Sequence, residues 1–386
     1  MSLAARRFHF VLTILGCFGG GSLYGWSGYQ PAVRAQFAVS NAAASMVFSL
    51  ALVSFTLGVL LGPMLLTRVP PRFRLPLLAG PAALSLCVSG ASTGFSGFVM
   101  AYGISFGFVS GAIYNHTISM ASASHAATLL VPVSVAAFGF GGAVFGPVHV
   151  WLTANGWGLW SIAPALICLT VVALLAFGAQ AQTGTEKTTS ARPTPMVRPD
   201  KTIAILWIIF AAGSCSGLIV LGFAAQILPP AAEGVGLESL AIFLAALGNT
   251  MGRLSSAVTA GRFGPARGIA GALVLSMIAL AGLTITATPG VVIGLLFLVA
   301  FAYGQLAATT PLLVKSQVGG AAFPGAFGWV FTGWGVAGLV GPWSAGWLLD
   351  ATGTLRFSLV ACIALAALSF WLVLRFPTRD PAEEIY

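Results

Sequence analysis

Residues 202–228 read TIAILWIIFAAGSCSGLIVLGFAAQIL, an apolar block without a charged side chain. A helix needs about 20 consecutive apolar residues to cross the hydrocarbon core of a bilayer, which is roughly 30 Å thick. Similar blocks recur along the chain, separated by short polar or Gly/Pro-rich segments. The block therefore predicts a membrane-spanning helix, and its recurrence predicts a chain that crosses the bilayer many times.

The composition supports the same interpretation. Of 386 residues, 58% are apolar and 6% are charged, whereas about 25% of the residues of a typical soluble protein are charged. So few charges could not cover the core of a soluble fold. The composition therefore excludes the soluble classes.

We expect an all-α membrane protein with twelve transmembrane helices. The predicted spans are residues 8–32, 42–66, 75–94, 96–122, 127–153, 157–180, 202–228, 237–261, 268–287, 289–314, 321–349 and 355–376. The first block is longer than the apolar region of a signal peptide and lacks a convincing small-residue cleavage site, so we interpret it as the first helix.

The basic residues predict the orientation, because Lys and Arg in short loops stay on the cytoplasmic side. With twelve spans, one side receives fourteen of the 17 basic residues: Arg6, Arg7, Arg68, Arg72, Arg74, Lys187, Arg192, Arg198, Lys201, Arg262, Arg267, Lys315, Arg375 and Arg379. Arg34 and Arg356 face the other side. We therefore expect both termini in the cytoplasm and the chain in the cell inner (cytoplasmic) membrane.

This charge distribution also bears on partners. Loop orientation and anionic lipid headgroups account for the net charge of +9, so the lipid bilayer is an expected partner and nucleic acid is not. We expect the protein to be a monomer.

The chain offers no pattern for a metal, a cofactor or a catalytic group. The five cysteines each lie alone in a predicted span, as small packing residues: Cys17, Cys87, Cys168, Cys215 and Cys362. No His/Asp/Glu constellation and no paired acids appear within the spans. We therefore expect neither a metal nor a cofactor, no catalytic residue, and no enzyme activity.

The longest polar stretch divides the chain into two halves. Residues 181–201 form the predicted cytoplasmic linker between six-helix bundles at residues 1–180 and 202–386. Two helix pairs carry similar motifs. Phe138-Gly139, Gly146-Pro147 and Trp151 match Trp334-Gly335, Gly341-Pro342 and Trp347 to within one residue in spacing, and Gly58-Val59 through Arg68 matches Gly252-Arg253 through Arg262 at equal spacing. Parallel six-helix repeats of this kind underlie transporters that bind substrate near the bilayer midplane.

Arg253 is the seventeenth basic residue, and it falls inside a predicted span. It precedes Arg262 by nine residues, so it lies about 13 Å from the cytoplasmic end of its helix. A cation at such depth costs at least about 2.5 kcal/mol and should face a cavity or a partner.

The acidic residues suggest no partner for it, since all eight fall in loops, helix ends or tails: Glu186, Asp200, Glu233, Glu238, Asp350, Asp380, Glu383 and Glu384. We expect an anionic substrate, because a planar guanidinium suits a carboxylate. Solvation of Arg253 by backbone carbonyls and water is the alternative.

Further polar and aromatic residues fall at compatible depths within the predicted spans. Asn249 lies one turn from Arg253 on the same helix face. The other candidates for substrate contacts are Tyr24, Tyr114, Asn115, His116, Tyr303, Gln305 and Trp334. Each of them could instead make an interhelical hydrogen bond or a packing contact.

At three motifs the chain resembles the major facilitator superfamily, and within it the oxalate/formate antiporter and monocarboxylate transporter group. The motifs are Ser22-Leu23-Tyr24-Gly25-Trp26-Ser27, Gly252-Arg253 and Val330-Phe331-Thr332-Gly333-Trp334-Gly335-Val336-Ala337-Gly338-Leu339. The resemblance implies alternating access, substrate carboxylate binding by Arg253, and a cavity lined from Tyr24, Tyr114 and Tyr303. Thr67-Arg68 stands where the superfamily has an Asp-Arg pair, and Gly261-Arg262 likewise lacks the aspartate in the second half.

Two departures from that group bear on the substrate. Oxalate carriers have a lysine where Trp334 aligns, and proton-coupled monocarboxylate carriers have an aspartate where this chain has Asn249. One cation favours a small organic anion with one carboxylate. A dicarboxylate/anion antiporter is an alternative. A drug exporter of the same superfamily is another, which the lack of a mid-span acid disfavours. We expect no membrane sensor, because the tails are short.

The same departures favour anion exchange or uniport over proton symport. His116 is the buried candidate for a proton-carrying group, because His9, His125 and His149 are expected nearer the membrane surfaces.

Overall fold

The computed structural model describes residues 3–124, 127–179, 198–230 and 234–376. Regular structure in these ranges is helical, and twelve of the helices are long and apolar enough to cross a membrane. They are Arg7–Phe37, Asn41–Leu66, Pro71–Gly90, Phe95–Ser122, Leu130–Ala154, Gly158–Gly178, Lys201–Phe223, Val235–Phe263, Pro265–Ile285, Pro289–Gly319, Ala322–Thr352 and Arg356–Val373. The all-α fold with twelve spans is confirmed, and the protein is a multi-pass membrane protein.

The chain forms two compact units. The first comprises Met1–Val39 and Val47–Pro193, and the second comprises Ser40–Met46 and Thr194–Tyr386. Of the predicted linker, residues 181–197 lie outside the described residues. We describe each unit by itself.

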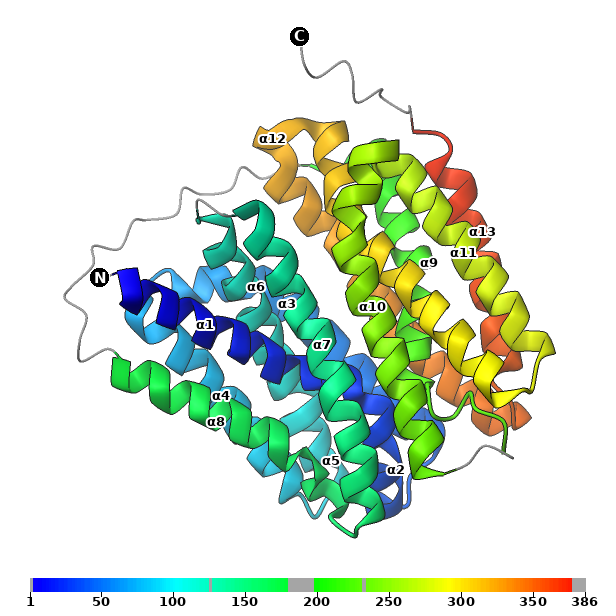
Figure 1. Cartoon of the computed structure of the whole chain (residues 1–386), viewed down its shortest axis with the longest axis horizontal. Coiled ribbons are helices and arrows are strands. Elements are labelled where there is room, and N and C mark those ends of the chain that lie inside the picture. The colour runs from blue at the N-terminus through cyan, green and yellow to red at the C-terminus, as the bar shows by residue number, and fades with distance from the viewer. Residues whose placement is uncertain (1–2, 125–126, 180–197, 231–233, 377–386) are drawn as a thin grey trace. The chain divides into compact units, whose positions relative to one another are not determined.

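The elements of the N-terminal part are α1 (Leu3–Gly20), η1 (Gly21–Gly25), α2 (Trp26–Phe37), α3 (Asn41–Leu66), α4 (Pro71–Gly90), α5 (Phe95–Phe98), η2 (Val99–Phe106), α6 (Gly107–Ser122), α7 (Ala127–Ala154), η3 (Gly158–Ile162) and α8 (Ala163–Gly178). The C-terminal part has α9 (Lys201–Phe223), α10 (Val235–Phe263), α11 (Pro265–Ile285), α12 (Pro289–Thr352) and α13 (Arg356–Val373) (Figure 1). Helix α12 contains two spans, which meet at Gly319, where φ is 76°.

Two spans depart from a regular α-helix. The first changes to a tight 3-10 turn, η1, directly after the glycine pair that ends α1. The fourth contains a π-helical segment, η2. Another difference concerns the third span, which begins at Pro71 and so places Arg72 and Arg74 in its first turn. Proline suits this position because the first N–H groups of a helix have no partner within it.

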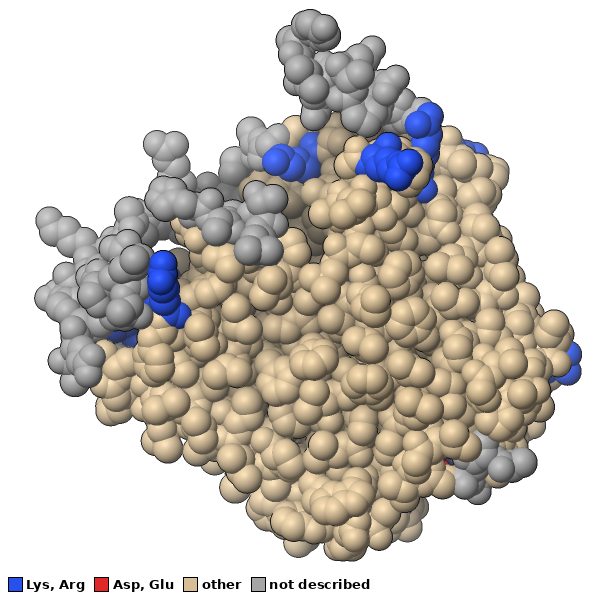
Figure 2. Space-filling model, in the orientation of Figure 1, with Lys and Arg blue, Asp and Glu red and all other residues tan. Residues whose placement is uncertain are grey.

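Large apolar side chains cover the outside of the helices. Val258 is 74% exposed, Ile278 65% and Ile285 83%. Figure 2 shows a broad surface whose middle has neither basic nor acidic side chains, with blue Lys and Arg side chains toward its edges. Such a surface is stable against lipid and unfavourable in water.

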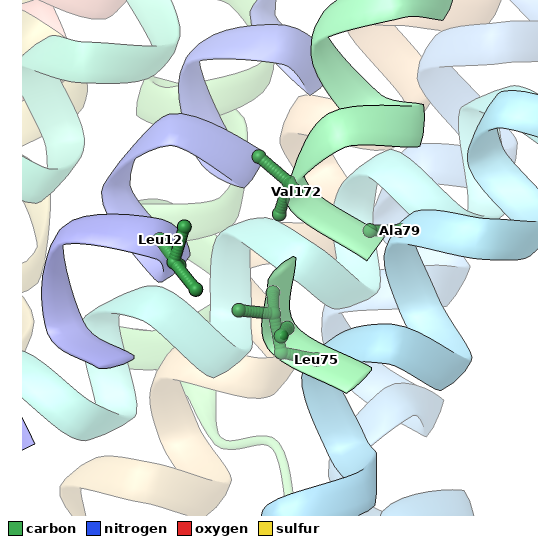
Figure 3. Close-up of a cluster of buried hydrophobic side chains, with 5 residues drawn as sticks. Leu12, Leu75, Ala79 and Val172 are labelled. Atoms are coloured by element: carbon green, nitrogen blue, oxygen red, sulfur yellow. The ribbon is translucent and has the colours of Figure 1, made fainter. Parts of the chain in front are cut away.

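The core of the N-terminal unit includes a cluster of small and branched side chains. Leu12 of α1 packs with Leu75 and Ala79 of α4 and with Val172 and Ala176 of α8 (Figure 3). Alanines let these helices approach closely, since packing between apolar helices in lipid depends on van der Waals contact. The cluster holds α1, α4 and α8 together.

In the C-terminal unit, glycines bring α10 and the first half of α12 into backbone contact. A Cβ atom added to Gly252 would overlap the carbonyl oxygen of Phe301, and one added to Gly304 would overlap the carbonyl oxygen of Asn249. Each helix therefore supplies a glycine where the other presents a carbonyl. Only glycine leaves room for this crossing.

The N-terminal unit has a crossing of the same kind between α3 and α6. A Cβ atom on Gly58 would overlap the carbonyl oxygen of Phe108, and one on Gly111 would overlap the carbonyl oxygen of Phe55. In both units each glycine follows the contacted residue of its own helix by three positions. The two crossings are thus built in the same register.

This register aligns the two units residue by residue at the crossing. Gly58 corresponds to Gly252, so the next residue, Val59, corresponds to Arg253. By the same count Phe55 corresponds to Asn249. One crossing therefore carries a cation and an amide where the other carries apolar side chains.

The first turn of α3 is capped by side-chain oxygens. Asp350 accepts from the backbone N–H groups of Asn41 and Ala42 at 3.0 and 2.8 Å, and Ser40 Oγ accepts from that of Ala43 at 3.2 Å. These N–H groups have no acceptor within the helix, and the positive end of the helix dipole favours a carboxylate. Asp350 therefore stabilises the start of α3.

Candidate functional site

Arg253 and Asn249 are in direct contact on α10. Arg253 Nε donates to Asn249 Oδ1 at 3.0 Å. Asn249 is fully buried and Arg253 is 7% exposed. The contact is the one that their separation of four residues predicts, because side chains four apart share a helix face.

The backbone of this turn is held by the glycine crossing with α12. A Cβ on Gly304 would lie 3.1 Å from the Arg253 backbone nitrogen, in addition to its overlap with the Asn249 carbonyl oxygen. Ser256 Oγ donates to the Arg253 carbonyl oxygen at 2.7 Å. The guanidinium therefore extends from a turn of α10 that is held on its α12 side.

Tyr303 and Trp334 form a second polar contact in the C-terminal unit. Trp334 Nε1 donates to the Tyr303 hydroxyl at 2.7 Å. The Trp334 ring also stacks on Phe331, with centroids 5.5 Å apart. Tyr303 precedes Gly304, so this pair adjoins the α10 crossing along α12. The predicted candidates thus lie on three spans of the C-terminal unit: Asn249 and Arg253 on α10, Tyr303 on the first span of α12 and Trp334 on its second.

Gln305 makes a contact further along α10. Its Nε2 donates to Thr259 Oγ1 at 2.7 Å, and Thr259 donates in turn to the Ser255 carbonyl oxygen. This bond joins α12 to α10, as the packing alternative for this residue predicts. A substrate contact of Gln305 stays a prediction.

In the N-terminal unit, Tyr24 and Tyr114 belong to one aromatic cluster. Phe138 of α7 lies at its centre, with its ring centroid 5.0 Å from that of Tyr24, 5.4 Å from Tyr114 and 5.1 Å from Phe55. Tyr114 also contacts Phe55, at 5.4 Å. The two tyrosine candidates are therefore brought together by phenylalanines from α3 and α7.

Asn115 and His116 follow Tyr114 on α6, and both are partly buried. Asn115 Oδ1 accepts from Ser119 Oγ at 3.2 Å. His116 Nε2 is buried and has no hydrogen-bond partner among the described residues. A structural hydrogen bond from this nitrogen to another helix is thus not formed within the described chain.

Sequence reasoning did not select Phe55 or Phe138 as site candidates. Phe138 appeared in a repeated motif, and that motif was the available signal. Sequence reasoning also did not select the buried polar contact toward the other end of α7, where His149 Nδ1 lies 2.9 Å from the Ser161 carbonyl oxygen. Tyr29 donates there to the Leu159 carbonyl oxygen at 2.9 Å. Only the three-dimensional arrangement brings these residues together.

Within the described residues, no three His, Cys, Asp or Glu side chains gather as a metal site would require. The five cysteines are all free thiols; Cys17, Cys215 and Cys362 are buried and Cys87 is exposed. The described acids lie at helix ends: Asp200 caps α9, Glu238 lies in the first turn of α10, and Asp350 caps α3. Arg253 is therefore a buried cation on α10, and the acid described on that helix, Glu238, lies fifteen residues before it.

The twelve-helix fold is shared with a solved transporter structure. The crystal structure of the human organic anion transporter MFSD10 (TETRAN) is similar to this chain, with a TM-score of 0.66. The match covers 95% of this chain and 99% of that chain at 14% sequence identity. By sequence, the chain matches no family model and no curated protein. Similarity at this identity shows the shared fold.

Proposed function

We propose that the protein is a secondary transporter of small organic anions, with monocarboxylates as the preferred substrates, and that Arg253 binds the carboxylate. The observation that carries the proposal is a buried guanidinium in the middle of a membrane-length helix, held at Nε by a neutral amide. Such a cation is costly in a membrane and marks a functional site by default.

The fold supports transport by alternating access. MFSD10, which has the same fold, is an organic anion transporter. Two units with matching internal crossings are typical of transporters built from repeats, in which the units rock about a central site. The protein then moves its substrate without chemical change, so it is no enzyme.

The charge pattern supports the substrate class and the orientation. Arg253 supplies one cation for one carboxylate, and Trp334 stands where the resemblance would place a lysine in an oxalate carrier. A second carboxylate would lose its hydration beside an indole, at a substantial cost in free energy. The basic loops support cytoplasmic termini and a location in the cell inner membrane, because Lys and Arg in short loops stay on the cytoplasmic side.

A ligand-induced thermal-shift screen tests the proposal on purified protein. Small carboxylates that bind the folded state raise its unfolding temperature by an amount that grows with the logarithm of one plus the ratio of the free ligand concentration to Kd. We expect monocarboxylates to raise it in the wild type and to lose this effect in Arg253→Ala. An equal shift in both proteins would contradict carboxylate binding by Arg253.

A further inference from the structure

The hydrogen bond between Arg253 and Asn249 fixes the orientation of the Asn249 carboxamide. A guanidinium has N–H donors and no acceptor, so only the amide oxygen can face Arg253 Nε. The amide nitrogen is thereby turned to the other side of the carboxamide. Asn249 therefore offers its two N–H donors away from Nε.

These donors have no acceptor in the described chain. Asn249 Nδ2 is buried and without a hydrogen-bond partner among the described residues, and the whole side chain is fully buried. Buried amide donors are almost always satisfied, because leaving one unsatisfied costs its full desolvation free energy. An acceptor supplied from outside the chain would satisfy this one.

The same bond limits how Arg253 can hold an anion. With Nε engaged by Asn249 Oδ1, a carboxylate meets the terminal Nη groups of the guanidinium. The Asn249 amide nitrogen is part of the same carboxamide whose oxygen accepts from Arg253 Nε. The residue that holds the guanidinium thus also carries an unsatisfied amide donor.

We propose that Asn249 positions Arg253 through its amide oxygen and donates from its amide nitrogen to the carboxylate that Arg253 binds. The inference rests on the proposed function, since it presupposes an anion at Arg253. It makes Asn249 a specificity-determining residue for anions. Phe55, the corresponding residue at the N-terminal crossing, has no such group.

Asn249→Asp and Asn249→Ala together test these roles. Aspartate keeps an oxygen for Arg253 Nε and strengthens that contact, but it removes both N–H donors and adds a negative charge. The new carboxylate also offsets the charge of Arg253, so Asn249→Ala, which adds no charge, is the deciding variant: a merely structural Asn249 would leave the Kd unchanged in Asn249→Ala. If Asn249 contacts the substrate, Asn249→Asp should weaken carboxylate binding at least a hundredfold, and Asn249→Ala should weaken it about tenfold, as expected for one lost charge-assisted hydrogen bond.

The measurement is the Kd of sodium pyruvate and of sodium acetate for the purified full chain by titration calorimetry. The unfolding temperature without ligand reports folding, and we expect Asn249→Asp to unfold no lower than the wild type. Asn155→Asp is the matched control, because Asn155 is exposed and bonds to Trp151 at the end of α7.

The outcomes separate the inference from the function on which it rests. Wild-type Kd values in Asn249→Ala, together with lost binding in Arg253→Ala, would overturn the role of Asn249 and leave the proposed function standing. Unchanged binding in Arg253→Ala, or no binding of either anion by the folded wild type, would overturn both.

Discussion

Gly304 determines how closely α12 approaches the turn of α10 that carries Arg253. Its missing side chain leaves room for the Asn249 carbonyl oxygen and the Arg253 backbone nitrogen. Any larger residue must push the helices apart or rotate one of them. The position of the guanidinium therefore depends on a residue that has no functional group.

We predict that Gly304→Ala destabilises the protein by about 1–3 kcal/mol, as overpacking of a tight contact does. It should also weaken carboxylate binding, because the Arg253 turn must move. Thermal unfolding in detergent and a ligand titration measure the two effects.

Gly294→Ala on the same helix is the matched control, since an added Cβ there meets nothing within 4 Å. Alanine should leave that site neutral or slightly more stable through its higher helix propensity. If both variants unfolded at the wild-type temperature, the proposed tightness of the crossing would be wrong.

At the scale of elements, the start of α3 depends on Asp350 of α12. The carboxylate accepts from two backbone N–H groups and from Asn41 Nδ2, at 2.8–3.0 Å. These residues are more than 300 positions apart in sequence. Capping by a distant residue lets one helix stabilise another.

We predict that Asp350→Ala lowers stability by about 1 kcal/mol, which is typical for the loss of a helix N-cap. Asp350→Asn should lose less, because its amide oxygen can still accept one of these bonds. Hydrogen exchange of the first turn of α3 reports the local effect. Unchanged exchange in Asp350→Ala would exclude this capping role.

The elements themselves were largely predictable from the sequence. Twelve apolar blocks of membrane length fixed the spans to within about five residues of those observed. The 3-10 turn of the first span and the π-helical segment of the fourth were not predicted. Hydropathy reports the preference of side chains for lipid and contains no information on such changes in backbone hydrogen bonding.

The site was predictable where it depends on one helix. The contact between Asn249 and Arg253 follows from a spacing of four residues. The contact between Trp334 and Tyr303, which lie 31 positions apart, needs the tertiary arrangement. The same holds for the gathering of Tyr24 and Tyr114 around Phe138.

At the scale of the whole molecule, one central cation predicts a preference for substrates of single charge. In competition assays with a labelled monocarboxylate, acetate, lactate or pyruvate should displace it better than oxalate or malonate. The second carboxylate of a dicarboxylate would have to shed its water beside Trp334. Stronger displacement by oxalate or malonate would contradict this preference.

Coupling to protons is the other property of the proposed transport. Proton symport needs a group that changes charge within the working pH range, and the described acids all lie at helix ends. His116, whose buried Nε2 lacks a partner in the described chain, is the candidate that the sequence selected; His149 is also buried, but its Nδ1 lies against the Ser161 carbonyl oxygen. We predict anion exchange or uniport driven by the substrate gradient.

Proteoliposomes with an alkaline interior measure this coupling. Counterflow that is independent of the pH gradient in both the wild type and His116→Gln is the expected result. Substrate accumulation that the gradient drives in the wild type, and that His116→Gln abolishes, would establish proton symport in its place.

Counterflow of a labelled monocarboxylate in Arg253→Lys and Arg253→Ala proteoliposomes tests the central claim most directly. Lysine keeps the charge but loses the planar fork, so both variants should insert normally and lose most transport. Arg262→Lys, in the last turn of the same helix, is the control and should transport like the wild type. Normal binding and counterflow in Arg253→Ala would contradict the account.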